Sequence, residues 1–264
     1  MLLKDKRILV MGLLDTRSVA WAIGQKAAEQ GAEVIYTVQS ERFRDSLLRR
    51  AFKSEGLSVD DYRVIPCDVA KDEEITALFD QIEAPLDGLV HSIGYANPKT
   101  CLQETMFEAP RADALYALEV SAASLVFVAG AARHKMTRGG SIIALTFDSQ
   151  HVYPNYNWMG VCKAALEASA RYLARDLGPQ GIRVNSLSAG PMRTMAATHI
   201  PGFVRMEAGW PERAPIGWNS TEDRFAVADT ALYLLSDLSS RVTAELIHVD
   251  GGFHHVAIGQ GSAE

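Results

Sequence analysis

Hydrophobic residues in this chain form short unbroken runs that alternate with stretches of helical periodicity. The run at residues 8–12 is apolar and ends at a glycine, which is typical of a buried parallel strand. Val19 and Ile23 then begin an apolar stripe of helical spacing, which Ser18 is placed to cap and Gly31 to end. The same alternation predicts further strands at 33–37, 62–66, 86–91, 141–147, 182–187 and 246–250, and helices at 42–53, 72–82, 111–136, 154–178 and 222–235.

This alternation covers the whole chain and predicts one α/β domain over residues 1–264. Because crossovers between parallel strands are right-handed, we expect a doubly wound Rossmann-type fold, with a parallel sheet of about seven strands and helices on both faces. Glycine and proline become dense at residues 190–217, which favours a mobile connection there rather than a domain boundary. In such folds the ligand binds at the carboxyl ends of the strands, so the turns that follow strands are where we expect chemistry.

Composition and charge exclude several classes of protein. The chain is 48% hydrophobic and 22% charged, which excludes collagenous, low-complexity and disordered proteins. A formal net charge of −6 argues against a nucleic-acid-binding protein, which needs positive charge to bind phosphates. The cysteines Cys67, Cys101 and Cys162 are too widely spaced to predict a disulfide framework or a zinc site, which favours a reducing compartment. No apolar run is long enough to predict a membrane span, so we expect a cytoplasmic protein with no membrane partner.

The turns after successive predicted strands offer groups for a dinucleotide. The first turn, at Gly12, lacks the GxGxxG pattern, and it suits either a pyrophosphate at the helix amides or an ordinary capped turn. Asp68 follows the third strand and suits either an adenine amino group or helix capping. Residues 92–94 offer a ribose a flexible backbone, and residues 189–194 offer backbone groups for a carboxamide.

The end of the second predicted strand distinguishes NADH from NADPH. A 2′-phosphate favours arginine or lysine at this point, whereas the chain has Gln39, which suits free ribose hydroxyls. NADH is therefore the expected cofactor, although Arg42 and Arg44 lie nearby in sequence.

Tyr156 and Lys163 are a candidate catalytic pair on one predicted helix. Seven residues fall about 20° short of two helical turns and rise about 10.5 Å, so both side chains share a face. A lysine ammonium near the phenol favours phenolate and can hold ribose hydroxyls. The plainer alternative is an amphipathic surface helix.

Five segments in chain order resemble the NADH-dependent enoyl-acyl-carrier-protein reductases of fatty-acid synthesis, which are divergent short-chain dehydrogenases/reductases. The Tyr-x6-Lys pair matches this divergent form, because the ordinary spacing of the superfamily is Tyr-x3-Lys. Phe147 and residues 214–218 look most like the actinobacterial and mycobacterial branch. The five segments are Gly12-x5-Ser18-Val19-Ala20, His91-Ser92-Ile93-Gly94, Pro154-Asn155-Tyr156-Asn157-Trp158-Met159-Gly160, Ala189-Gly190-Pro191-Met192-Arg193-Thr194 and Val249-Asp250-Gly251-Gly252.

The resemblance implies reduction of the trans-2 double bond of an enoyl thioester carried by acyl carrier protein or coenzyme A. Hydride would pass to the β-carbon, and Tyr156 would donate to the enolate oxygen. Lys163 would bind the nicotinamide ribose and Thr194 a phosphate. The other cofactor contacts it implies are Gly12, Ser18, Val19, Gln39, Asp68, Val69, Ser92, Ile93, Gly94, Gly190, Pro191 and Met192.

The resemblance also implies an apolar substrate pocket that a segment near residues 194–217 covers. Phe147 stands where many bacterial members carry a tyrosine, so the hydroxyl of that tyrosine is absent. Arg193 and Arg205 are candidates for a positive spot that meets an acidic carrier protein. Members of the family form homotetramers, so the resemblance implies a homotetramer for this chain too. The expected pocket residues are Phe147, Tyr95, Met159, Met195, Ile200 and Phe203.

Two other functions remain open from the residues alone. A carbonyl reductase acting on a ketone or a 3-oxoacyl thioester would use the same Tyr156 and Lys163. A non-catalytic dinucleotide sensor would bind NADH without turnover, and the presence of both side chains argues against it. The histidines are densest at His254 and His255, but no Cys or Glu lies near them at a spacing typical of metal ligands, so we expect no metal.

Overall fold

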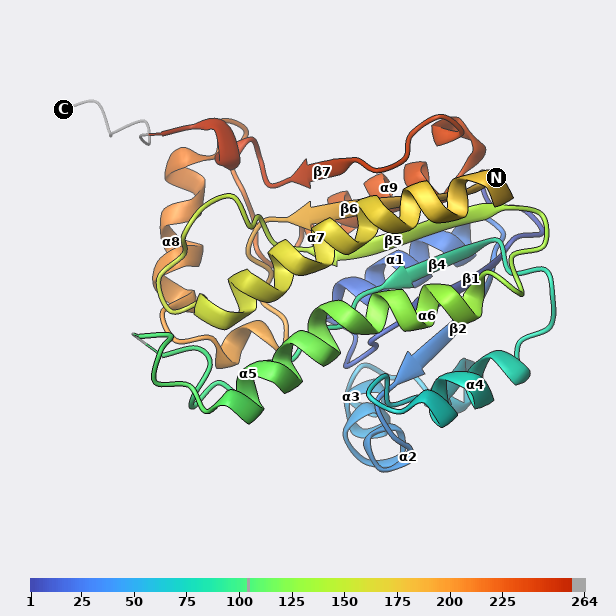
Figure 1. Ribbon diagram of the computed structural model, residues 1–264, viewed down its shortest axis with the longest axis horizontal. Coiled ribbons are helices and arrows are strands. Elements are labelled where there is room, and N and C mark those ends of the chain that lie inside the picture. The colour runs from blue at the N-terminus through green and yellow to red at the C-terminus, as the bar shows by residue number, and fades with distance from the viewer. Residues whose placement is uncertain (104, 258–264) are drawn as a thin grey trace.

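The computed structural model describes residues 1–103 and 105–257, and its centre is a seven-stranded parallel sheet (Figure 1). The strand order is β3-β2-β1-β4-β5-β6-β7, so the chain builds outward from β1 to one edge and then returns beside β1 to build the other half. This reversal between β1 and β4 is the topological switch point of a doubly wound fold. The strands are Arg7–Met11 (β1), Glu33–Val38 (β2), Arg63–Pro66 (β3), Gly88–His91 (β4), Gly140–Thr146 (β5), Ile182–Ala189 (β6) and Leu246–Val249 (β7).

Helices cover both faces of the sheet, as the sequence predicts. One apolar core joins the sheet to α1 and α9, and a second joins its other face to α4, α6 and α7, which lie in front of the strands in Figure 1. The interiors of β1 to β6 are therefore covered on both sides, which explains their unbroken apolar runs, whereas the edge strand β7 is half-buried. The helices are Val19–Glu29 (α1), Glu41–Phe43 (α2), Arg49–Ser54 (α3), Asp72–Asp80 (α4), Arg111–Leu118 (α5), Ser124–Ala132 (α6), Asn157–Leu177 (α7), Phe203–Arg213 (α8) and Arg224–Leu235 (α9).

Two predicted helices contain a wider turn. The predicted helix at 42–53 is divided into α2, a π-helical stretch Arg44–Leu48 and α3, and the predicted helix at 111–136 is divided into α5, the π-helical stretch Glu119–Ala123 and α6. The continuous helix Arg111–Ala132 is long and apolar enough, by length and composition alone, to cross a bilayer, and half of its most apolar stretch is buried inside the protein. A core helix of a globular protein has the same properties.

The segment rich in glycine and proline contains a helix that the sequence analysis did not predict. After β6 the chain forms the short 3-10 turn Ala197–His199 and then α8. Phe203 and Trp210, one near each end of α8, are buried and anchor this helix. Figure 1 shows α8 beyond the end of the sheet towards which β6 and β7 point, so it lies over the carboxyl ends of the strands.

Candidate functional site

A cavity of about 470 Å³ opens at the carboxyl ends of the central strands. The turns after β1, β4 and β6, the last residues of β5, the first turns of α7 and the segment that leads into α8 form its walls. The structure thus brings together most of the residues singled out from the sequence: Gly12, Ser18, Val19, Ser92, Ile93, Gly94, Tyr95, Phe147, Tyr156, Met159, Lys163, Gly190, Pro191, Met192, Thr194, Ile200 and Phe203.

Four of the predicted site residues do not line this cavity: Gln39, Asp68, Val69 and Met195. Gln39 is exposed just beyond the end of β2. Asp68 accepts a hydrogen bond from the backbone amide of Ala70 at 3.1 Å, which stabilises the turn before α4. The sequence analysis considered helix capping for Asp68, but the N-cap of α4 is Lys71. The assignment of Gln39 and Asp68 to a cofactor stays a prediction, which rests on their positions at strand ends and on the family resemblance.

The cavity also has walls that the sequence analysis missed. Thr146, the last residue of β5, had the clearest signal, because polar residues at the ends of buried strands face the ligand in this class of fold. The sequence pattern does not distinguish the small and apolar lining residues from ordinary core or loop residues. The missed lining residues are Leu14, Ala96, Pro98, Leu102, Leu145 and Thr146. Five further lining residues lie in segments that the sequence had already assigned to the carboxamide or to the cover: Ala189, Ala196, Ala197, His199 and Met206.

Close packing between β1 and β4 explains the glycine at the first turn. Gly12 has a φ of +85°, and a Cβ atom built on it would lie 2.2 Å from the carbonyl oxygen of Ser92. Ser18 caps α1, since its Oγ accepts from the amide of Trp21 at 3.2 Å and donates to the carbonyl of Asp15 at 2.7 Å. The turn after β1 is thus held against the turn after β4, which gives the cavity one continuous wall.

Lys163 lies at the junction of three cavity walls. Its side chain is buried, and its Nζ donates a hydrogen bond to the carbonyl oxygen of Leu145 at 2.9 Å. A Cβ atom built on Gly94 would lie 3.6 Å from the same Nζ, so the ammonium also faces the turn after β4. Burial lowers the pKa of Lys163 to about 8, because the surroundings disfavour the charged form.

Tyr156 occupies the N-cap of α7 and faces the same cavity. Burial raises the pKa of its phenol above the ordinary value, and the neighbouring Cys162 and Glu167 raise it further. From the sequence we expected the lysine to favour phenolate, whereas in the structure burial raises the pKa of Tyr156 and so disfavours phenolate. The structure therefore holds Tyr156 as a neutral phenol, which is suited to donating a hydrogen bond.

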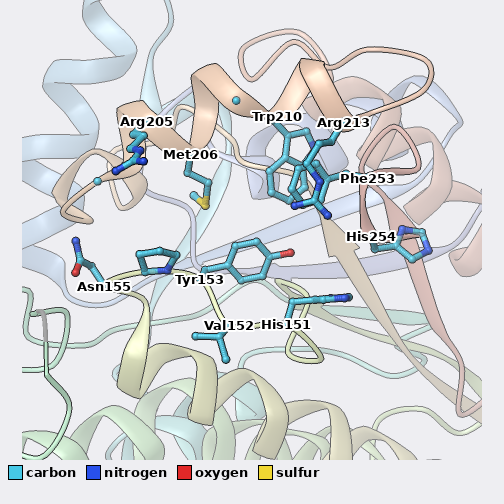
Figure 2. A pocket seen from close by; sticks show the side chains of 13 residues that line it. His151, Val152, Tyr153, Asn155, Arg205, Met206, Trp210, Arg213, Phe253 and His254 are labelled. Carbon is cyan, nitrogen blue, oxygen red and sulfur yellow. The ribbon is translucent and has the colours of Figure 1, made fainter. Parts of the chain in front are cut away.

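Aromatic side chains form the wall between this cavity and a second one. The ring centroid of Phe147 lies 5.2 Å from that of Tyr156, 4.7 Å from that of Tyr153 and 5.8 Å from that of Trp210. Figure 2 shows Tyr153 pointing into the second cavity, which has a volume of about 750 Å³ and lies between residues 151–155 and α8. Phe147 therefore does more than fill space, since it joins the catalytic tyrosine candidate to the anchor of α8.

Carboxylates hold two of the histidines, His151 before α7 and His254 after β7. His254 Nδ1 lies 2.9 Å from Asp250 Oδ2, and the His254 ring stacks on His248 with centroids 3.8 Å apart. His151 Nδ1 lies 2.5 Å from Asp148 Oδ2. In the part of the chain that the structure describes, no group of three or more His, Cys, Asp or Glu side chains is arranged to hold a metal ion.

The chain is similar to known proteins over nearly its whole length, in sequence and in fold. Residues 12–254 match the family model described as enoyl-(acyl carrier protein) reductase. The chain is 42% identical over 257 residues to the NADH-dependent enoyl-[acyl-carrier-protein] reductase FabI of Bacillus cereus, an alignment that covers 96% of this chain and 98% of the relative. It is also 42% identical over 258 residues to the NADPH-dependent FabI of a Staphylococcus aureus strain, with 96% and 98% covered.

A solved structure has the same fold. The crystal structure of the enoyl-(acyl-carrier-protein) reductase from Anaplasma phagocytophilum in complex with NAD superposes with a TM-score of 0.88 at 36% identity, and 98% of each chain is covered. Sequence and fold thus point to the same group of enzymes.

Proposed function

The chain belongs to the enoyl-(acyl carrier protein) reductase family, and we propose from this membership how its cavity performs the NADH-dependent reduction of a trans-2-enoyl thioester in fatty-acid biosynthesis. The observation that carries the assignment is that Tyr156 and Lys163 share one cavity with the turns after β1, β4 and β6. The reaction converts an enoyl thioester, NADH and a proton into the saturated acyl thioester and NAD⁺.

The donor groups of the cavity fit a nicotinamide dinucleotide. Phosphates need hydrogen-bond donors, which the amides at the start of α1 and the Thr194 hydroxyl supply. The Lys163 ammonium suits the hydroxyls of the nicotinamide ribose, and the backbone of residues 190–192 suits the carboxamide. The rest of the cofactor is assigned to Gly12, Ser18, Val19, Gln39, Asp68, Val69, Ser92, Ile93 and Gly94.

Tyr156 stabilises the charge that develops during reduction. Bound NADH supplies the hydride that adds to the β-carbon of the substrate. Negative charge then develops on the thioester oxygen, where the phenol of Tyr156 donates a hydrogen bond. Because burial raises the pKa of Tyr156, the phenol keeps its proton at neutral pH and remains a donor.

The substrate lies against the apolar walls of the same cavity. We assign Phe147, Tyr95, Met159, Ile200 and Phe203 to contact with the acyl chain, because each of them lines the cavity. Met195 does not line it, and we assign this side chain to the cover rather than to the pocket wall. The segment at 194–217, which includes α8, is the proposed cover of the substrate.

An acidic carrier protein needs a positive spot near the mouth of the cavity. Arg193 is already engaged, since its guanidinium donates to the carboxylate of Glu207 through both Nε and Nη2. Arg205 is exposed on α8, close to the residues that line the cavity. We therefore assign carrier docking to Arg205 in preference to Arg193.

The expected homotetramer is supported by apolar side chains on the outer helices. Leu115, Val126 and Phe127 on the continuous helix Arg111–Ala132 and Tyr172 on α7 are partly exposed, between 39% and 63%. Burying them against further copies of this chain would remove apolar surface from water. The proposed location, the cytoplasm, is where an enzyme of fatty-acid synthesis with three free cysteines fits best.

The decisive experiment follows NADH oxidation by the purified protein with trans-2-enoyl thioesters of increasing chain length. Absorbance at the NADH band should fall rapidly, and Tyr156→Phe or Lys163→Ala should remove most of the rate. A ketone and a 3-oxoacyl thioester serve as controls for carbonyl reduction. If NADH binds but is not oxidised with any enoyl thioester, or if only the ketone is reduced, the proposed function is wrong.

A further inference from the structure

Glu167 on α7 is a buried carboxylate that the mechanism above does not use. Its side chain is 4% exposed. Its Oε1 accepts from the hydroxyl of Thr146 at 2.8 Å, and its Oε2 accepts from the hydroxyl of Ser149 at 2.6 Å. Within residues 1–103 and 105–257, no Lys, Arg or His side chain forms an ion pair with it. A buried charge without a cation is costly, and charge-assisted hydrogen bonds of this kind are what offset that cost.

The two hydroxyls that Glu167 binds belong to the segment in which β5 ends. Thr146 and Ser149 lie on either side of Phe147, whose ring contacts Tyr156. The preceding residue, Leu145, supplies the carbonyl oxygen that accepts from Lys163. Residues 145–149 are thus attached to α7 at two places one helical turn apart, by Lys163 and by Glu167.

We propose that Glu167 is a positioning residue of the reductase, which holds residues 145–149 so that Lys163 and Tyr156 keep their productive geometry. This inference rests on the proposed roles of Tyr156 and Lys163. Without the carboxylate, Thr146 and Ser149 lose their shared acceptor, and the Leu145 carbonyl and the Phe147 ring are free to shift. A displacement of about 1 Å at such supports is enough to slow a reaction by up to a hundredfold.

The charge of Glu167 also acts on the pair. Burial lowers the pKa of Lys163 and raises the pKa of Tyr156, and Cys162 followed by Glu167 raises the pKa of both groups. The other titratable groups that face Lys163 are the Cys162 thiol on the same helix and His91 on β4, whose pKa burial lowers to about 3, so that it stays neutral. Because burial raises the pKa of the Cys162 thiol to about 11, this thiol is neutral near pH 7, and Glu167 is the negative group that favours the ammonium form of Lys163 there.

The test compares Glu167→Gln with Ser149→Ala and with Asp176→Asn, an exposed carboxylate on the same helix that pairs with Arg175. Each purified protein is assayed for kcat and for KM of NADH and of one enoyl thioester across the pH range. Glu167→Gln should lower kcat by tenfold to a hundredfold and move the alkaline loss of kcat/KM to lower pH by on the order of one unit. Ser149→Ala should lower kcat less and leave the pH profile in place, because it keeps the charge. Asp176→Asn should change neither.

The proposal would be overturned if kcat/KM of Glu167→Gln fell at the same alkaline pH as that of the unchanged protein and its kcat were also unchanged. If Glu167→Gln does not fold, Ser149→Ala still tests the proposal. This variant must lower kcat with unchanged thermal stability, and an unchanged kcat would overturn the proposal. An unchanged protein that reduces no enoyl thioester contradicts the proposed function instead, so the two failures are distinguishable.

Discussion

Lys163 donates a hydrogen bond from Nζ to the carbonyl oxygen of Leu145, and this 2.9 Å contact holds its ammonium in a buried position. Burial lowers the pKa of Lys163 from its ordinary value to about 8. The ammonium is therefore lost as the pH rises through 8, rather than through the range usual for lysine. We predict that kcat/KM for NADH falls above about pH 8, because the neutral amine binds ribose hydroxyls without the help of a charge.

The effect of Lys163 on stability distinguishes this loss of activity from unfolding, because the two change in opposite directions as the pH rises. Between pH 8 and the ordinary pKa of lysine, the folded protein binds fewer protons at Lys163 than the unfolded chain does, so this group makes the fold more stable as the pH rises. Activity should thus fall above pH 8, whereas the deprotonation of Lys163 does not lower the thermal midpoint in that range. Initial rates at low NADH, measured with melting curves from pH 6 to 10, check this. A kcat/KM that stays flat to pH 10 would contradict it.

Much of the site was predictable from the sequence because it lies at strand ends, where an apolar run stops abruptly. Gly12 was found this way, from the apolar run that it ends. Lys163 was found from its helical spacing to Tyr156 instead. Glu167 was not found, because a carboxylate on a helix reads as a solvated surface residue until the fold shows that it is buried against the end of β5. α8 was missed for a related reason, since its burial depends on contacts of Trp210 with segments distant in sequence.

Substituting Gly12 by alanine should destabilise the protein. The new Cβ would lie 2.2 Å from the Ser92 carbonyl oxygen, at a φ of +85° that alanine rarely adopts. We expect a loss of about 2 kcal/mol or more in the free energy of unfolding. Urea unfolding measures it.

Gly130→Ala on α6 is the matched control. A Cβ on Gly130 meets no atom within 4 Å, so the change should be neutral or should stabilise the helix by about 0.5 kcal/mol or more. Equal losses in the two variants would show that the close approach of β1 and β4 is not what requires a glycine at position 12.

Removing the Phe147 ring should impair both chemistry and stability. Its ring contacts Tyr156, Tyr153 and Trp210, so Phe147→Ala leaves a space beside the phenol and loosens the support of α8. We expect kcat to fall roughly tenfold and the free energy of unfolding to fall by about 3 kcal/mol. The exposed Phe107, which is 82% accessible, gives the control variant Phe107→Ala. A kcat for Phe147→Ala equal to that of Phe107→Ala would contradict the role of this ring.

Cofactor choice should depend on the end of β2. Gln39 follows this strand and provides no positive charge for a 2′-phosphate, and the nearby Arg44 guanidinium is bound to the carboxylate of Asp45, with Nε 2.9 Å from Oδ1. We therefore expect NADH to be used in preference to NADPH, even though one relative with 42% identity is NADPH-dependent. Gln39→Arg supplies the missing guanidinium, and it should shift the ratio of kcat/KM values towards NADPH by on the order of tenfold, the factor that about 1.4 kcal/mol produces. The same substitution at the exposed Gln180, which precedes β6 at the opposite end of the sheet, controls for net charge. A preference for NADPH in the unchanged protein, or an equal shift in both variants, would show that Gln39 does not determine the choice.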